Sequence, residues 1–291
     1  SYRVMVCQAL NEENPLIKGV PVDKVAFTVQ VNPEMMRIKW NPHKIPSAFI
    51  KAHMDILLPG GYNRLVTEGK VSELDEAIDV HQAKLEDFLM TYPGFSYSST
   101  IKKGGAVTEY LGKNNGSNSI ATYDKTAEIK VKNANFYWNN DNAGFEKEPV
   151  PKYSIMRVEE RHKFKKNPKP SLSDLLNEKI FPNHFKKINI THHLQDSFKG
   201  QPKTVGQMVQ RQFIQNCNSI GLQQARLNLT PEYRKKMDGL LAENKVDWWN
   251  PNILSQRANR IHILINPKPL PKKAISHLEE MLGCLFPHGI Y

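Results

Sequence analysis

The segment from Ser154 to Phe164 carries charged residues at alternate positions, and this pattern constrains the fold more than any other feature of the sequence. Successive side chains of an extended strand point to opposite faces of a sheet. One face of this strand would carry Arg157, Glu159, Arg161 and Lys163, and the other Met156, Val158, Glu160 and His162. A strand with charge on its inner face is unusual, because buried charges must be paired or functional.

Two earlier segments also read as strands with polar residues on one face. The segment 71–80 would place Asp75 and Asp79 on the same side as Ala77, with Leu74, Ile78 and Val80 on the other. After a Gly- and Asn-rich turn at 112–117, a further strand would carry Tyr123 and Lys125 on a shared face.

The remaining patterns predict an α+β fold. Residues 2–40 read as β structure, Ser47 could cap a helix, residues 85–89 suggest a short helix, and 133–150 resemble a surface loop or excursion. From 165 onward, a basic, proline-punctuated stretch leads into mostly helical patterns. We therefore expect an antiparallel-sheet catalytic domain with flanking helices at 1–164, followed by a basic, mainly helical DNA-binding region at 165–291.

The positive charge of the chain is concentrated in its second half. Residues 1–150 contain 17 Lys and Arg against 18 Asp and Glu, whereas residues 151–291 contain 23 against 11. A basic surface of this kind can bind a polyanion, or can simply be solvated. Charge alone leaves both interpretations open.

Cysteine, histidine and apolar patterns narrow the class of protein. The three cysteines are far apart and predict buried, reduced thiols, and the ten histidines are not expected to form a ligand constellation. No apolar run approaches the ~18 residues that a membrane-spanning helix needs. We expect a cytoplasmic protein with no membrane partner.

The three polar strands together could provide phosphoryl-transfer chemistry. Carboxylates such as Asp75, Asp79 and Glu159 are suitable ligands for Mg²⁺ or Mn²⁺, which prefer oxygen donors. A phenol with an ordinary pKa of about 10 is a weak nucleophile, and a nearby divalent metal and Lys125 would favour its ionised form. Arginines on the same face could hold phosphate oxygens through forked hydrogen bonds.

The order of these clusters resembles the replication initiators of filamentous phages and of the Rep_trans group of rolling-circle plasmids. Three stretches carry the resemblance, together with the turn Tyr110-Leu-Gly112: they are Glu73-Leu-Asp75-Glu-Ala-Ile-Asp79, Tyr123-Asp-Lys125-Thr-Ala-Glu128 and Arg157-Val-Glu159-Glu-Arg161-His-Lys163. The resemblance covers roughly residues 70 to 165. Glu73 stands where the family usually has arginine, and the His-hydrophobe-His motif of other relaxases is absent.

The resemblance implies a site-specific, metal-dependent DNA nicking-closing endonuclease. Tyr123 would attack one phosphodiester of the origin, stay linked to the 5′ phosphate and release a 3′ hydroxyl as primer. Lys125 would stabilise phosphate or phenolate. The implied metal ligands are Asp75 and Glu159, then Asp79 and Glu128; the implied phosphate contacts are Arg157, Arg161, Lys163, Lys165 and Lys166. Origin DNA, as duplex, hairpin and single strand, is the implied partner, with a host helicase, a polymerase and a second copy of the chain as further candidates.

Each of these residues also has an ordinary structural interpretation. The aspartates could protect a strand edge, Tyr123 could be a packed aromatic, and Arg157, Glu159 and Arg161 could form an ion-pair ladder. A different class of function would then be a nonenzymatic DNA-binding protein, with a helix-turn-helix within 204–229. A third class would be a nuclease that uses an activated water, with no covalent intermediate.

Overall fold

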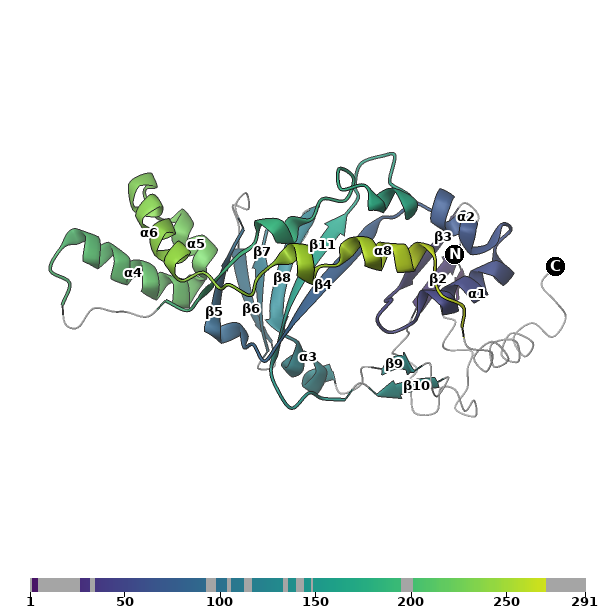
Figure 1. Cartoon of the computed structure of the whole chain (residues 1–291), viewed down its shortest axis with the longest axis horizontal. Helices are drawn as coiled ribbons and strands as arrows, with labels where there is room; N and C mark the ends of the chain where they lie inside the picture. Colours follow the sequence, from purple (N-terminus) through teal and green to yellow (C-terminus); the bar gives the residue numbers. More distant parts are fainter. Residues whose placement is uncertain are drawn as a thin grey trace.

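A five-stranded antiparallel sheet forms the centre of the molecule (Figure 1). The computed structural model describes residues 2–4, 27–31, 35–92, 98–103, 106–112, 117–132, 136–139, 144–147, 149–194 and 201–270. The strands follow the order β4-β11-β8-β7-β6. Their bounds are β4 (Glu73–His81), β6 (Ser98–Lys103), β7 (Ala106–Leu111), β8 (Asn118–Asp124) and β11 (Ile155–Lys163). The predicted α+β class with an antiparallel sheet is confirmed.

Strand β11 lies between β4 and β8 and fixes the register of both. Arg157 is opposite Asp79 on β4 and Tyr123 on β8. From Met156 onward, buried residues alternate along β11 with half-buried ones, as a strand with two different faces requires. The alternation predicted for the segment 154–164 is therefore present in the structure.

Three smaller sheets surround the central one. They comprise β1 (Tyr2–Val4), β2 (Phe27–Val31) and β3 (Met36–Trp40); β5 (Phe88–Thr91) with β12 (Asn189–His192); and the hairpin β9 (Phe136–Asn139) and β10 (Gly144–Lys147). The short helix predicted at 85–89 is present only in part, as the 3₁₀ helix η1 (Leu85–Asp87). Phe88 and Leu89 belong to β5, because pairing with the distant β12 outweighs local helix propensity. The surface loop or excursion predicted at 133–150 includes the paired strands β9 and β10.

The part of the second half that the structure describes is mainly helical, as predicted. Thr204 caps one of these helices by accepting a hydrogen bond from the Gln207 amide at 3.2 Å. Ser47 does not act as a cap, because it is already the first helical residue and Pro46 precedes it. The helices are α1 (Ser47–Leu57), α2 (Gly61–Glu68), α3 (Lys125–Lys132), α4 (Val205–Ile220), α5 (Leu222–Leu227), α6 (Pro231–Glu243), α7 (Pro251–Leu254) and α8 (Arg257–Ile265), with 3₁₀ turns η2 (Ser173–Leu176) and η3 (His184–Lys187).

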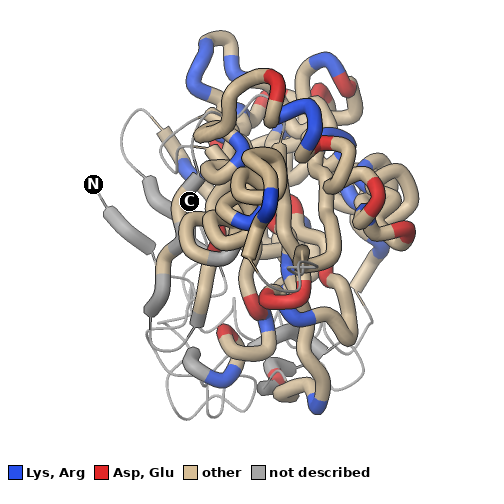
Figure 2. The backbone as a smooth tube through the Cα atoms, turned by 90° about the vertical axis from the view of Figure 1, so that its left-hand side faces the viewer, with Lys and Arg blue, Asp and Glu red and all other residues tan. Residues whose placement is uncertain are grey.

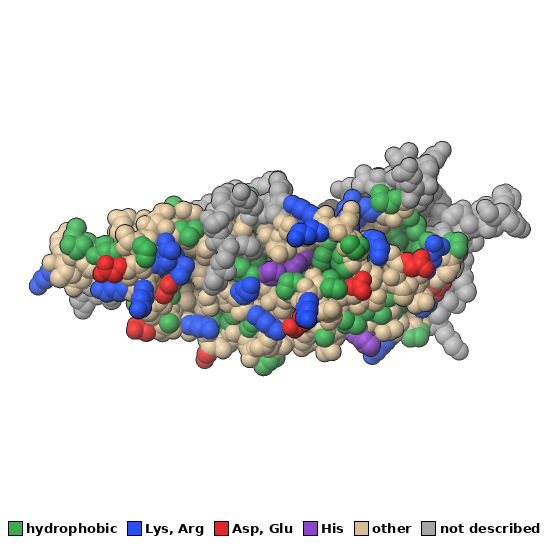
Figure 3. Space-filling view, turned by 90° about the horizontal axis from the view of Figure 1, so that it is seen from above, with side chains coloured by type: hydrophobic (Ala, Val, Ile, Leu, Met, Phe, Trp, Pro, Cys, Tyr) green, Lys and Arg blue, Asp and Glu red, His purple; other side chains and the backbone are tan. Residues whose placement is uncertain are grey.

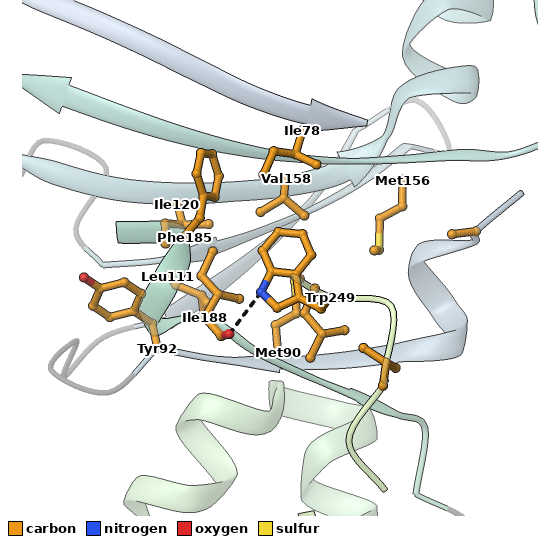
Figure 4. Packing of buried hydrophobic residues seen from close by; sticks show 13 residues of the cluster. Ile78, Met90, Tyr92, Leu111, Ile120, Met156, Val158, Phe185, Ile188 and Trp249 are labelled. Atoms are coloured by element: carbon orange, nitrogen blue, oxygen red, sulfur yellow. Dashed lines mark hydrogen bonds between the residues drawn. The ribbon is translucent and has the colours of Figure 1, made fainter. Parts of the chain in front are cut away.

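The second half also completes the hydrophobic core of the sheet. Phe185, Ile188 and Trp249 pack against Ile78, Val158 and Met156 of the sheet (Figure 4). The Trp249 indole donates a 3.1 Å hydrogen bond to the Ile188 carbonyl. Full burial of a phenylalanine or isoleucine side chain, such as Phe185 or Ile188, stabilises the fold by roughly 1.5–3 kcal/mol. One face of the sheet is therefore covered by residues that follow 165 in the sequence.

The other elements extend the molecule at both ends of this sheet. Helices α4, α5 and α6 lie at one end, and α1, α2 and β3 lie at the other (Figure 1). Each end has a core of its own: Phe213, Leu222 and Met237 belong to the first, and Phe49 and Tyr62 to the second. Among the described helices, none is both long and apolar enough to cross a membrane.

Candidate functional site

The three polar clusters predicted from sequence meet on one face of the central sheet. Arg157 faces Asp79 and Tyr123 across its two neighbouring strands, and Arg161 faces Asp75 in the same way. This face is opposite to the one that packs on the core. We call it the polar face and define it by Asp75, Asp79, Tyr123, Arg157, Glu159 and Arg161.

Glu159 joins the tyrosine to an arginine at the centre of the polar face. The Tyr123 hydroxyl donates a 3.0 Å hydrogen bond to Oε2 of Glu159, and Arg161 Nε donates a 2.7 Å bond to Oε1. Burial, followed by the negative charges of Glu159 and Glu128, raises the pKa of Tyr123 above its ordinary value. The phenol is therefore protonated in this arrangement, and an acceptor for its proton is already in contact with it.

Arg157 and Asp79 form the most regular ion pair of the polar face. Two parallel hydrogen bonds, each 2.6 Å long, join the guanidinium to both carboxylate oxygens. Burial alone would raise the pKa of Asp79, but the bonds and charge of Arg157 outweigh it and hold that pKa below its ordinary value. Asp79 is consequently ionised, and its oxygens are occupied by arginine.

Lys125 does not share a strand face with Tyr123, and that prediction is wrong. The Asp124 carboxylate accepts a 2.9 Å hydrogen bond from the Ala127 amide, so it ends β8 and caps α3, whose first residue is Lys125. The signal available in the sequence was Asp124 itself, a short polar residue of the type that commonly caps a helix, directly before Lys125. Lys125 is buried and donates a 2.8 Å hydrogen bond to Glu128. Its charge still helps to lower the pKa of Asp79, so the pair borders the polar face.

Asp75 differs from the other carboxylates of the polar face because, among the described residues, no basic side chain forms a hydrogen bond with it. Among the described residues it accepts no hydrogen bond, and partial burial and then the charge of Glu159 raise its pKa to about 6, despite opposition from Arg161. Two carboxylates that repel each other in this way favour a cation between them. The role of Asp75 and Glu159 as metal ligands stays a prediction, since both oxygens of Glu159 already accept hydrogen bonds from Tyr123 and Arg161.

The four predicted carboxylate ligands are not gathered around one point. Within the described ranges, Asp75, Asp79, Glu128 and Glu159 do not form a group of three whose ligand atoms lie within 4.8 Å of one another. Asp79 and Glu128 are engaged by Arg157 and Lys125. Their role as ligands stays a prediction that would require these ion pairs to open.

The predicted phosphate contacts extend away from the tyrosine. Lys163 lies six residues beyond Arg157 on β11, which corresponds to about 20 Å along a strand. Lys165 and Lys166 follow the end of the strand and are exposed. These lysines therefore lie well away from Tyr123 along the sheet. Tyr110, from the turn Tyr110-Leu-Gly112, is a second tyrosine to consider as a nucleophile. It lies on β7 opposite Ala121 and acts electrostatically on Arg161.

A second polar cluster lies on the opposite, buried face and was missed from the sequence. Glu160, His162 and His184 bring their ligand atoms within 4.8 Å of one another, as a candidate metal-binding group. Glu160 hydrogen-bonds His162, and His184 Nε2 lies 4.0 Å from Glu160 Oε1. The expectation that the histidines form no ligand constellation is therefore wrong. Glu160 and His162 at alternate positions of one strand were a readable signal, but nothing in the sequence connects them to His184.

Comparison with known proteins adds no assignment to these two clusters. No protein-family model matches the chain, and no curated protein is significantly similar to it.

Proposed function

We propose that this protein is a rolling-circle replication initiator that nicks and rejoins one strand of origin DNA through Tyr123. The observation that carries the proposal is the 3.0 Å hydrogen bond from the Tyr123 hydroxyl to Glu159 on the polar face. It places a proton acceptor against the phenol, and two arginines lie beside it. A general base within about 2.6–3.2 Å of the proton it removes has the geometry that such catalysis needs.

The chemistry follows from these contacts. Tyr123 Oη would attack a phosphorus atom while its proton passes to Glu159. The bond between phosphorus and the 3′ oxygen would break, and that oxygen would leave as a hydroxyl after taking a proton from solvent. The 5′ phosphate would remain on Tyr123, and attack by a 3′ hydroxyl on this linkage would reverse the step and close the strand.

The residues around the phenol supply the remaining requirements. Arg157 and Arg161 would exchange their carboxylate partners for phosphate oxygens, which have the same forked acceptor geometry. Asp75, with Glu159, would hold the proposed Mg²⁺ or Mn²⁺. Such an ion, when bound, would polarise the phosphodiester and neutralise charge on it. The raised pKa of Asp75, about 6, predicts that metal binding there weakens below this pH.

The proposal is tested with supercoiled DNA that carries the replicon encoding this chain, incubated with protein and Mg²⁺ or Mn²⁺. The native chain should produce nicked circles and protein-linked DNA. Tyr123→Phe should abolish the adduct, and Glu159→Gln should slow nicking by about a hundredfold or more. Tyr233→Phe is the matched control, because Tyr233 lies on α6, at one end of the molecule and outside the central sheet.

The outcomes separate the candidate mechanisms. An adduct with Tyr123→Phe would show that another residue is the nucleophile, and Tyr110→Phe would then be examined. Nicking without any adduct would favour an activated water in place of the tyrosine. Salt-sensitive DNA binding without nicking would favour the nonenzymatic class.

One arrangement favours that nonenzymatic class as a second candidate. Helices α4 and α5, within the stretch predicted to hold a helix-turn-helix, join at Gly221 with a φ of 81°, which an L-residue rarely adopts. Lys203, Lys235 and Lys236 are exposed nearby. Figure 2, which looks onto this end of the molecule, shows further Lys and Arg segments, and Figure 3 shows basic side chains spread along another face. Replacing Lys235 and Lys236 by alanine should then weaken binding and reduce its dependence on salt by about two charges.

A further inference from the structure

We propose that Glu160, His162 and His184 bind one Zn²⁺ ion and that this ion fastens β11 to the segment that covers it. The proposal is independent of the nicking activity, because the three residues lie on the face of the sheet opposite to Tyr123. Two imidazoles and a carboxylate form a ligand set that suits zinc, whereas Mg²⁺ prefers oxygen ligands throughout.

The distances between the ligand atoms are close to those that zinc needs. Ligand atoms around a tetrahedral zinc with bonds of about 2.0–2.1 Å are roughly 3.3 Å apart. The Glu160–His162 contact is shorter than this, and His184 Nε2 lies 4.0 Å from Glu160 Oε1. Opening the first contact and closing the second would require side-chain adjustments, with no change of strand register.

Two of the three ligands, His184 and Glu160, are held by a partner on their other polar atom. The Tyr92 hydroxyl contacts Nδ1 of His184, which leaves Nε2 directed at Glu160. Arg257 Nη2 donates a 2.8 Å hydrogen bond to Oε2 of Glu160, which leaves Oε1 for a metal. Such outer contacts fix the orientation and the ligating atom of metal-binding side chains. The Asn118 amide lies 3.4 Å from His184 Nε2, where its oxygen end could act as a fourth donor.

The local charge also calls for a cation. Glu76 and Glu160 are adjacent across β4 and β11 and are both buried, and Arg257 bonds to both. Oε1 of Glu76 has no hydrogen-bond partner among the described residues, and Arg260 reaches it only at 4.0 Å. Two carboxylates against one buried guanidinium leave one negative charge to balance. A proton on Glu76 is the alternative to a metal ion for balancing this charge, because burial raises the pKa of Glu76.

The position of the ligands suggests what the ion would do. Glu160 and His162 belong to the central strand, whereas His184 opens the 3₁₀ turn η3 in the covering segment. Within the described chain, only side-chain contacts and packing connect His184 to β11. A shared zinc ion would therefore act as a cross-link between parts of the chain that are far apart in sequence, and would stabilise the fold when bound.

The test uses the full chain after treatment with a chelator, with Zn²⁺ and then Co²⁺ as probes and no DNA. The native chain should bind one Zn²⁺ and melt at a higher temperature with it, and Co²⁺ should give the visible absorption of a tetrahedral site. His184→Gln should lower zinc affinity by at least about tenfold, and Tyr92→Phe by about 10–100-fold through loss of orientation. His192→Gln is the matched control, because His192 is exposed on β12.

Several results would overturn the proposal. Folded native chain that binds no zinc would show that a proton balances the charge. Equal zinc affinity in His184→Gln and the native chain would place the ion elsewhere. Where His184→Gln does not fold by circular dichroism, the zinc affinity of Tyr92→Phe decides the question, since that variant retains all three ligands. None of these readouts depends on DNA cleavage, so they are separate from the test of Tyr123.

Discussion

Glu159 and Glu160 are neighbours on β11 that point to opposite faces of one sheet, and their surroundings differ completely. Glu159 is half-buried and contacts Tyr123 and Arg161. Glu160 is fully buried and contacts Arg257 and His162. Two glutamates that are adjacent in sequence therefore belong to different networks. The network of Glu159 is accessible to solvent, whereas the network of Glu160 is enclosed.

The difference shows how solvent access determines what an ion pair can do. On the polar face, water can replace a carboxylate at a lower cost than in the buried cluster, because pairs that solvent reaches contribute less net energy. In the proposed function, a DNA phosphate would make the same exchange. On the buried face, breaking a pair leaves a charge in a medium that solvates it poorly. We therefore expect substitutions on the two faces to have effects of different size and kind.

The largest effect is expected when the buried cation is removed. Arg257→Met leaves Glu76 and Glu160 without their guanidinium, and removal of one partner from a buried pair costs about 3–5 kcal/mol. Urea unfolding should show this loss. Arg260→Met is the control, because its side chain is 46% exposed and should cost under about 1 kcal/mol. Equal losses in the two variants would show that the burial of Arg257 does not determine the size of the effect.

A smaller effect is expected for the ion pair of the polar face. A double-mutant cycle between Arg157→Ala and Asp79→Ala should give a coupling of about 1–2 kcal/mol, since the pair is bidentate but only partly covered. The exposed pair Arg64 and Glu68 should give less than about 0.5 kcal/mol in the same measurement. A coupling of about 3–5 kcal/mol, as expected for the buried Arg257 pairs, would mean that Arg157 is bound too tightly by Asp79 to contact DNA as proposed.

The smallest expected effect is a pH dependence at Asp75. Its pKa in the folded chain, about 6, is above the ordinary 3.8, so the folded state binds this proton more tightly than the unfolded state. The resulting stabilisation is complete below about pH 3.8 and is lost as the pH rises through 6. Asp75→Asn should remove this component of the stability profile, and solvent access limits the gain at pH 7 to under about 1 kcal/mol. Glu86→Gln is the control, because Glu86 is exposed. If Asp75→Asn leaves the dependence of stability on pH unchanged, as the control should, this prediction is wrong.

The sequence was informative where strand periodicity applies. Because β11 alternates strictly, the partition of Arg157 and Glu159 from Val158 and Glu160 could be predicted, and so could the shared face of Asp75 and Asp79. Periodicity extends only as far as the strand. The side-chain cap at Asp124 turned the chain into α3 and moved Lys125 away from its predicted position.

Contacts between distant segments could not be predicted in the same way. His184 and Arg257 approach Glu160 from segments 24 and 97 residues away, and a local pattern does not identify a partner at such a separation. Phe185 and Trp249 likewise read as apolar positions, without any indication that they would cover the sheet. The predicted functional division at 164 and 165 stays a prediction, although residues on both sides of it share one core.

The alternation along β11 has a consequence for how such a protein can vary over evolutionary time. A substitution can alter one face and leave the other intact, so the two clusters can diverge separately. Insertion or deletion of a single residue within the strand would exchange the faces, because the side-chain period is two. Glu160 would then stand where Tyr123 now finds Glu159, but His162 would replace Arg161. In homologous proteins, β11 should therefore keep its length even where its residues change.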